Sequence, residues 1–377
     1  GYASFVVHGD AISSQSALSG KPAAVALEWL RHVLEHSPSG WMLRNALFMH
    51  AAGLSNIYAD LLSRASKRHK LDEVCAAVGV ACAVRPLRDE TRALLVSAFY
   101  ALAASYMEEH GADTFPQVAY LFSGPMGRVN GMDMIGAEAG VLVHMYDHVN
   151  STNFNFDSDP GFTAARGLCA ASAAVAMSPE CSPFCVAKFY GKEGPSPLFS
   201  NSMIHGDGSD DAAYWTTHYE GVLLILRDTL QRGAPFVVES VPDYGSKTLS
   251  DGRKNPLYKC KLSEHCPLWR WPPMANFIKH SGARLIVFSQ CMLPPQSPPK
   301  DTTSAPTALL VSSDVYPHLR DLDGLLCDHT GHASLSGLDE HGAFKTKTKA
   351  AWVAGLNRRV FTALQAAVDA KGTWRAA

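Results

Sequence analysis

A cysteine and a glutamate occupy corresponding places in this 377-residue chain, each close behind a short apolar run. Cys181 lies in the segment Ser-Pro-Glu-Cys-Ser-Pro-Phe, which follows the apolar residues 171–177, and Glu239 follows Phe-Val-Val. A cysteine thiolate is a nucleophile, and a carboxyl group at the end of a buried strand can have a raised pKa and donate a proton. Attack on a pyrimidine ring needs both groups. The alternatives are a small core cysteine and a carboxylate that caps a turn.

A glycine-containing turn precedes both residues. It comprises Phe122, Ser123, Gly124, Pro125, Met126 and Gly127. Glycine lets the backbone approach a ligand, and N–H groups at a helix start can bind it. Asp147 ends the next apolar run, where a carboxylate commonly accepts hydrogen bonds from ribose hydroxyls. The structural alternatives are a tight strand-to-helix turn and a surface aspartate.

The pattern of strands and helices that must position these residues predicts an α/β fold. Short apolar runs alternate with longer segments that can be helical, which predicts a mostly parallel, Rossmann-like sheet with helices on both faces. The predicted strands are residues 118–122, 141–146, 171–177, 236–239, 285–289 and 308–312, and the helix predicted before Glu239 spans 212–230. Ligands of such sheets bind beyond the carboxyl ends of the strands, so these features are expected to line one crevice.

The amino-terminal part of the chain differs in pattern. Leu27, Leu30 and Leu34 recur at helical spacing, and residues 1–115 are predicted to form a helical domain ahead of a second domain over 116–377. The chain begins at Gly1, which is compatible with a processed product or with a piece of a polyprotein or larger assembly.

Composition limits the partners and the compartment. Lys plus Arg (33) nearly balance Asp plus Glu (35), so any DNA site must be a local patch. Nine cysteines spread over the chain favour a reducing, intracellular compartment, with the nucleus as the working expectation. No apolar run approaches the roughly 20 residues of a membrane helix, so no membrane partner is expected.

A last group, Cys327, His329 and His332, has residue types that bind metals. With Cys260, His265 or Cys266 it could complete a tetrahedral zinc site. Because no second close pair of ligands supports zinc, a hydrogen-bonded loop is the favoured interpretation and no metal ligand is predicted.

In order, these segments resemble the cytosine-5 DNA methyltransferases. The family's Asp-Leu-Phe-x-Gly-x-Gly-Gly, Pro-Cys-Gln and Glu-Asn-Val motifs are similar to residues 120–127, 179–182 and 239–241. Residues 117–370 most resemble a divergent branch found in algal, protist and retroelement-type sequences. The segments that carry this likeness are Leu-Phe-Ser-Gly-Pro-Met-Gly-Arg (121–128), Cys-Pro-Leu-Trp-Arg (266–270), Phe-Ser-Gln-Cys (288–291), Ala-Pro-Thr (305–307) and Cys-Asp-His (327–329).

The resemblance implies a cofactor, a substrate and roles for the residues. S-adenosylmethionine would bind over the turn from Phe122 to Gly127, with Asp147 near its ribose and Pro179 beside it. Cys181 would add to C6 of a cytosine extruded from DNA, while Glu239 protonates or hydrogen-bonds N3. Residues 262–345 would take the place of the target-recognition region. The phosphate contacts expected there are Arg270, Arg284, Lys300 and Lys345.

Four positions depart from the family motifs. Tyr120 replaces an acid, Met126 replaces a glycine, Glu180 separates the proline from the cysteine, and Ser240 replaces an asparagine.

The sequence supports three functional hypotheses: DNA cytosine-5 methylation, a catalytically inactive methyltransferase-fold subunit with a binding or assembly role, and a cysteine-dependent hydrolase or transferase. The last needs a histidine base, for which His205 and His218 are nearest in sequence.

Overall fold

A computed structural model describes residues 115–128, 130–189, 196–293, 306–332 and 352–372, together with scattered residues from 96 to 111. The chain divides into two units, residues 1–105 and 106–377, and the sheet belongs to the second. The predicted helical domain over 1–115 lies almost wholly outside the described residues, of which those from 96 to 108 are helical.

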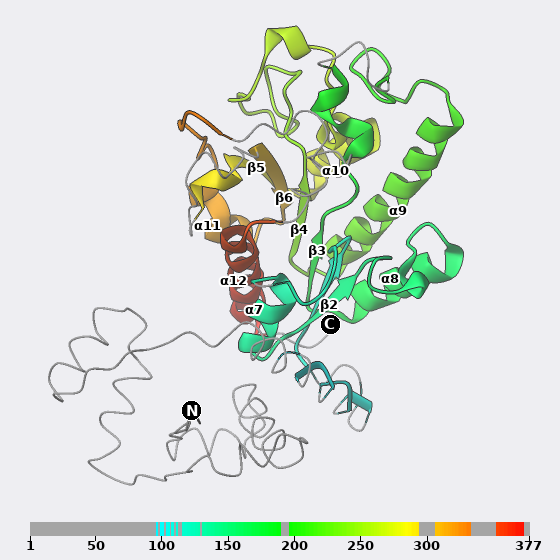
Figure 1. Ribbon diagram of the computed structural model, residues 1–377, viewed down its shortest axis with the longest axis vertical. Coiled ribbons are helices and arrows are strands. Elements are labelled where there is room, and N and C mark those ends of the chain that lie inside the picture. Colours follow the sequence, from blue (N-terminus) through cyan, green and yellow to red (C-terminus); the bar gives the residue numbers. More distant parts are fainter. Residues whose placement is uncertain are drawn as a thin grey trace, which may run out of the picture. The chain divides into compact units, whose positions relative to one another are not determined.

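The second unit is built on a six-stranded mixed sheet in the order β2-β1-β3-β4-β6-β5 (Figure 1). The strands are β1 (Gln117–Leu121), β2 (Leu142–Tyr146), β3 (Ala174–Met177), β4 (Phe236–Ser240), β5 (Arg284–Ser289) and β6 (Pro306–Val311). β2, β1, β3 and β4 pair in parallel, whereas β6 is antiparallel to both β4 and β5. The predicted α/β class and mostly parallel sheet are therefore confirmed.

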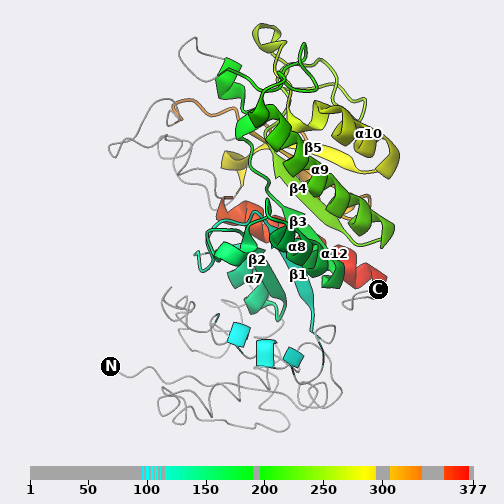
Figure 2. The same ribbon diagram turned by 90° about the vertical axis from the view of Figure 1, so that its right-hand side faces the viewer.

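Helices cover both faces of the sheet (Figures 1 and 2). One face carries α8 (Asp159–Ala171), α9 (Asp210–Gln231) and α10 (Pro272–Ser281), and the other carries α7 (Met132–Glu138), α11 (Tyr316–Leu319) and α12 (Ala354–Lys371). The remaining short helices are 3₁₀ turns. They are η3 (Thr152–Phe154), η4 (Ser182–Phe184), η5 (Val186–Phe189), η6 (Cys260–Leu262), η7 (Leu268–Arg270), η8 (Gln290–Met292) and η10 (Arg320–Leu322).

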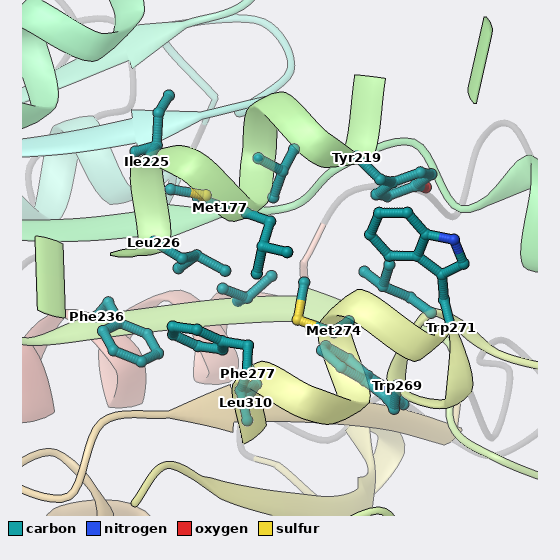
Figure 3. Packing of buried hydrophobic residues seen from close by; sticks show 14 of the residues in the cluster. Met177, Tyr219, Ile225, Leu226, Phe236, Trp269, Trp271, Met274, Phe277 and Leu310 are labelled. Carbon is teal, nitrogen blue, oxygen red and sulfur yellow. The ribbon is translucent and has the colours of Figure 1, made fainter. Parts of the chain in front are cut away.

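Alternation along the strands divides the apolar side chains between two cores. In β1, Leu121 points into the core under α8, α9 and α10, whereas Tyr120 points into the core under α7 and α12. Figure 3 shows the first core, where Met177 and Phe236 of the sheet pack against α9 and α10. Each such side chain, fully buried, stabilises the fold by roughly 1.5–3 kcal/mol. These two cores fix the sheet edge that carries the candidate site.

The predicted element boundaries differ from the structure in one informative place. Residues 171–177 were expected to be a single strand, but Ala171 ends α8 and β3 starts only at Ala174. An alanine-rich apolar run does not distinguish the end of a helix from a buried strand. The predicted helix over 212–230 is confirmed as α9, whose N-cap Ser209 accepts a hydrogen bond from the Ala212 N–H at 3.2 Å.

Strand order defines where a ligand would bind. The chain places β2 on one side of β1 and β3 on the other, so the order switches between β1 and β3. Because β1 to β4 are parallel, their carboxyl ends meet at one edge of the sheet, next to that switch. Within the described part of the chain, no helix combines the length and apolar character needed to span a membrane.

Candidate functional site

The strand register brings the predicted site residues into one row. Leu121 pairs with Tyr146 of β2 and with Met177 of β3, and Met177 pairs with Val238 of β4. One residue further along each strand, the row runs Asp147, Phe122, Ser178, Glu239. Backbone hydrogen bonds extend the pairing, from Phe122 N–H to Tyr146 O at 2.8 Å and from Ser178 N–H to Leu121 O at 3.1 Å. The strand ends that precede these residues therefore lie side by side at one edge of the sheet.

The turn after β1 has a left-handed backbone at three positions. Gly124 and Gly127 have φ of 69° and 73°, which glycine adopts without strain, and Phe122 has φ of 57°. A phenylalanine in this region is uncommon and strained. Its ring packs against Phe156 and His218, with centroids 4.8 and 5.3 Å away. Packing therefore holds Phe122 in a conformation that directs the chain sharply out of the sheet.

Three polar side chains close this turn from outside. Gly124 N–H donates to Asp147 Oδ2 at 2.8 Å, Met126 N–H to Asn150 Oδ1 at 2.9 Å, and Gly127 N–H to Asp133 Oδ2 at 2.6 Å. Ser123 is buried, while Pro125 and Gly127 are exposed. The guanidinium of Arg128 also lies at the turn, where its Nη2 donates to Ser123 O at 2.9 Å. Since the three N–H groups already have acceptors, they are not free to bind a phosphate, and the carboxylates of Asp147 and Asp133 can serve hydrogen-bond donors of a ligand.

Asp147 and Asp133 carry the negative charge beside the turn. Asp147 Oδ1 also accepts from Val149 N–H at 3.1 Å and lies 3.2 Å from His148 Nδ1. Asp133 is buried, and its Oδ1 has no hydrogen-bond partner among the described residues. Asp147 therefore has a structural role in the turn in addition to the predicted ligand contact. Asp133, which the sequence analysis did not single out, is the carboxylate with an unused oxygen.

Changing Gly124 to alanine is expected to lower the free energy of unfolding by about 1–2 kcal/mol, because an L-residue is strained at its positive φ. Gly167→Ala is a matched control at an exposed position of α8, and it is expected to raise the free energy of unfolding by about 0.5–1 kcal/mol. A Cβ has room at both positions, since its nearest neighbour at Gly124 is 3.8 Å away and at Gly167 nothing lies within 4 Å. Urea unfolding measures both values, and equal effects would contradict the left-handed turn.

Glu239 lies at the end of β4 on the side of the sheet that faces α12. Burial raises the pKa of its carboxyl group to about 7, against a smaller opposing effect of the polar groups of Trp352 and Ser178 beside it. Trp352 packs on Tyr120, with ring centroids 5.2 Å apart, and its buried Nε1 has no acceptor in hydrogen-bond geometry among the described residues. At neutral pH, Glu239 therefore populates both its protonated and its ionised form.

Cys181 directly precedes η4 at the carboxyl end of β3. The residue is exposed and the neighbouring Pro179 is buried. Surrounding protein raises the pKa of the Cys181 thiol, and the charges of Glu239 and Glu180 raise it further. Cys181 lies near enough to Glu239 for their charges to interact. The sheet edge therefore brings the predicted pair together, with the thiol held protonated.

The two histidines considered as bases have different environments. His205 is exposed, whereas His218 is buried in α9 with its Nδ1 2.6 Å from Asp157 Oδ1. The buried Nε2 of His218 has no hydrogen-bond partner among the described residues. Within that part of the chain, neither histidine hydrogen-bonds to Cys181, so the geometry gives the hydrolase hypothesis no nucleophile–base pair.

A basic surface follows Glu239 in the segment between β4 and α10. It carries four exposed lysines: Lys247, Lys254, Lys259 and Lys261. Two of the residues predicted to contact phosphates are less suitably placed than these lysines. Arg270 is half-buried, and Arg284 begins β5 at the opposite edge of the sheet. Lys300 and Lys345 lie outside the described residues. The exposed lysines that follow Glu239 therefore precede the predicted region over 262–345.

The residues of types that bind metals lie beside a fourth such residue that was not predicted. Cys327, His329 and His332 lie with Cys291, which follows β5. The three residues considered as the fourth ligand have other surroundings: His265 Nε2 contacts Phe184 O at 3.0 Å, Cys266 is buried against Pro267 O, and Cys260 is exposed. No sequence feature favours Cys291, because backbone hydrogen bonds between β5 and the segment after η10 bring Cys291 and Cys327 together.

One pocket, of about 430 Å³, lies between α8 and α9 and is lined by Arg166, Asp228 and Arg232. It lies toward the amino-terminal ends of the strands, away from Cys181 and Glu239. Arg232 donates hydrogen bonds to the carbonyl oxygens of Cys169 and Ser172. Arg166 forms an ion pair with Asp228, with Nε 2.6 Å from Oδ2. This pocket therefore offers no free charge to a ligand.

The carboxyl-end edge thus combines a thiol, a carboxyl group with a raised pKa and a glycine turn beside two carboxylates. Ser178, Trp352, Asp133 and Asn150 complete it, and none of them was predicted. Asp133 and Asn150 follow the turn and the next strand closely in sequence, whereas Trp352 had no sequence signal. Comparison with protein-family models, with curated proteins and with solved structures finds no match for this chain. Function is therefore inferred from these residues and their geometry.

Proposed function

We propose that the chain binds S-adenosylmethionine at the turn after β1 and methylates C5 of cytosine in DNA. The observation that carries this proposal is the common sheet edge, where the glycine turn, Cys181 and Glu239 meet at a switch in strand order. The resemblance of the same three segments to cytosine-5 DNA methyltransferases supplies the reaction. A Rossmann-like methyltransferase fold is part of the proposal.

The charges at the turn support this class of cofactor. S-adenosylmethionine has a sulfonium, an ammonium group, a carboxylate and ribose hydroxyls, and it has no phosphate. Asp147 lies at the turn and Asp133 has an unpaired buried oxygen, so both can serve positive or hydrogen-bond-donating groups. When bound, the cofactor would supply an electrophilic methyl group next to the row of strand ends.

The chain's own residues would prepare the cytosine. The Cys181 thiolate forms a bond to C6, and the electron pair of the C5–C6 double bond makes C5 nucleophilic while Glu239 donates to N3. After the methyl group is bound at C5, loss of the C5 proton to a base expels the thiolate and restores the ring. The cytosine must leave the duplex stack, because the thiolate approaches the ring face that stacking hides.

A second candidate is a catalytically inactive methyltransferase-fold subunit with a binding or assembly role. The raised pKa of the Cys181 thiol favours it, because burial and, after it, the charges of Glu239 and Glu180 oppose formation of the thiolate. Ser240 favours it as well, since its buried hydroxyl has no hydrogen-bond partner among the described residues and replaces the asparagine of the family motif. For the enzyme hypothesis, a bound cationic cofactor must offset these carboxylates.

The basic segment after β4 supports a polyanionic partner. Lys247, Lys254 and Lys259 are exposed within the loop that begins just after Glu239. Lysines bind phosphates as point charges, and such contacts position DNA without reading its sequence. We therefore place the DNA backbone along this segment in the proposed complex.

Titration calorimetry with S-adenosylmethionine tests the first step. We expect one site per chain, with affinity at least about tenfold weaker in Asp147→Ala, because that change removes a ligand contact and the acceptor that holds Gly124. Asp211→Ala, an exposed change at the start of α9, is the matched control and should bind like the unmodified chain. Absence of binding heat and of a thermal shift would contradict the enzyme hypothesis.

A further inference from the structure

Four metal-binding side chains converge beyond the carboxyl end of β5, away from the proposed catalytic residues. They are Cys291, Cys327, His329 and His332, whose ligand atoms all lie within 4.8 Å of one another. Cys327 Sγ lies 3.4 Å from His329 Nδ1 and 2.9 Å from His332 Nε2. We propose that this Cys₂His₂ cluster binds one zinc ion.

The dimensions and the chemistry of the cluster fit zinc. Zn–S bonds of about 2.3 Å and Zn–N bonds of about 2.0–2.1 Å in a tetrahedron separate the ligand atoms by roughly 3.3–3.8 Å. The separation of Cys327 Sγ from His329 Nδ1 lies within that range, the one from His332 Nε2 lies about 0.4 Å below it, and no pair of ligand atoms is more than 4.8 Å apart. Side-chain movements of about 1 Å or less would therefore bring the four ligand atoms to tetrahedral spacing. Two thiolates with two imidazoles at tetrahedral spacing select zinc over the hard cations, which prefer oxygen ligands.

The backbone around the cluster is already held in place. The segment that carries Cys327 runs beside β5, with Gly324 N–H donating to Val287 O at 2.8 Å and Ser289 N–H donating to Leu325 O at 2.9 Å. Cys327 N–H donates to Ser289 Oγ at 3.1 Å. Residues 291 and 327 are thus brought together by strand pairing without the metal, and the ion would join the end of β5 to the following loop.

Four protein ligands leave no open position, so the site is structural rather than catalytic. It is nevertheless connected to the sheet edge through Gln290, the neighbour of Cys291. Gln290 Nε2 donates to Thr307 Oγ1 at 2.7 Å, and its Oε1 accepts from Val353 N–H at 3.3 Å. Val353 follows Trp352, which lies beside Glu239. The ion would therefore help to fix the surroundings of Glu239, although the zinc site does not depend on the proposed methylation.

Metal analysis of the full chain purified under reducing conditions tests the site. We expect about one zinc per chain, and Co²⁺ exchanged for zinc should give the visible bands of tetrahedral cobalt with thiolate ligation. Cys327→Ser should lose both signals. Cys260→Ser, an exposed cysteine outside the cluster, is the matched control and should keep them. Cys291→His keeps a zinc ligand at that position and should retain the metal with altered cobalt bands, which separates ligand loss from misfolding.

Three results would overturn the proposal. Purified chain without bound metal that also fails to take up Co²⁺ would show that the four side chains form only a hydrogen-bonded cluster. Retention of the thiolate–cobalt bands in Cys327→Ser would place the metal elsewhere. A disulfide between Cys291 and Cys327 in chain isolated under reducing conditions, found by peptide mass spectrometry, would account for their proximity without an ion.

Discussion

Replacing Cys181 with alanine is expected to lower methyl transfer to cytosine by at least about 10⁴-fold, because the reaction needs a covalent bond to C6 before C5 can accept a methyl group. Cofactor binding should be unchanged within about twofold, since the thiol is not expected to hold the cofactor. Transfer of labelled methyl from S-adenosylmethionine to duplex DNA measures the first quantity, and calorimetry measures the second.

Gln231→Ala is the control for this change, because Gln231 is exposed at the end of α9 and lies outside the proposed cofactor and DNA sites. Its transfer rate should equal that of the unmodified chain. Retained turnover in Cys181→Ala would contradict the nucleophile assignment. Binding of the cofactor without transfer by the unmodified chain would instead favour the inactive subunit, in which burial and the neighbouring carboxylates keep the Cys181 thiol protonated.

Changing Glu239 to glutamine is expected to reduce methyl transfer by about 10²–10⁴-fold, the usual contribution of a positioned proton donor. It should also alter the pH profile. With a thiol pKa above that of Glu239, the reactive form has a thiolate and a protonated carboxyl group. The transfer rate should then rise with pH and level off near pH 7, where Glu239 loses its proton. In Glu239→Gln the rate should continue to rise above pH 7.

Glu239→Gln should raise the stability of the fold above pH 7, although it lowers methyl transfer. The pKa of Glu239 rises from 4.5 in the unfolded chain to about 7 in the fold, so the unfolded chain binds fewer protons between these values and stability falls as pH rises through them. The cost above pH 7 is up to about 3 kcal/mol, and glutamine avoids it. Urea unfolding should show Glu239→Gln more stable than the unmodified chain at pH 8 and similar at pH 5.

Glu220→Gln, an exposed change on α9, controls for the loss of one negative charge and should leave stability at both pH values unchanged. Equal stability of Glu239→Gln and the unmodified chain at pH 8 would contradict a raised pKa of the Glu239 carboxyl group. A loss of transfer without any change in the pH profile would assign Glu239 a positioning role instead of proton donation.

The strands that carry the site could be predicted because they are short, apolar and buried on both faces. Such runs identify parallel strands directly, and the order of Phe122, Cys181 and Glu239 at their ends followed from sequence alone. The start of β3 could not be located, because Ala171 and Ala173 extend the small apolar residues of the strand backwards into the end of α8. The reversed strand β6 could not be recognised either, since apolar content contains no information about direction.

The immediate surroundings of the site depend on contacts between residues far apart in the chain. Trp352 reaches Glu239 from the segment before α12, and Cys291 reaches Cys327 only because the loop after η10 pairs with β5. No spacing rule relates these positions. The raised pKa of the Cys181 thiol likewise depends on how many atoms surround it and on the distance to Glu239, both of which require the fold.

The most direct test of the central claim uses a DNA duplex with 5-fluorocytosine at the target position. Fluorine replaces the C5 proton that the base must remove, so the enzyme cannot complete the reaction and remains bonded to C6. With S-adenosylmethionine present, we expect a denaturant-resistant protein–DNA adduct that contains the transferred methyl group and is attached at Cys181. Absence of an adduct, or an adduct at another residue, would contradict methylation through Cys181.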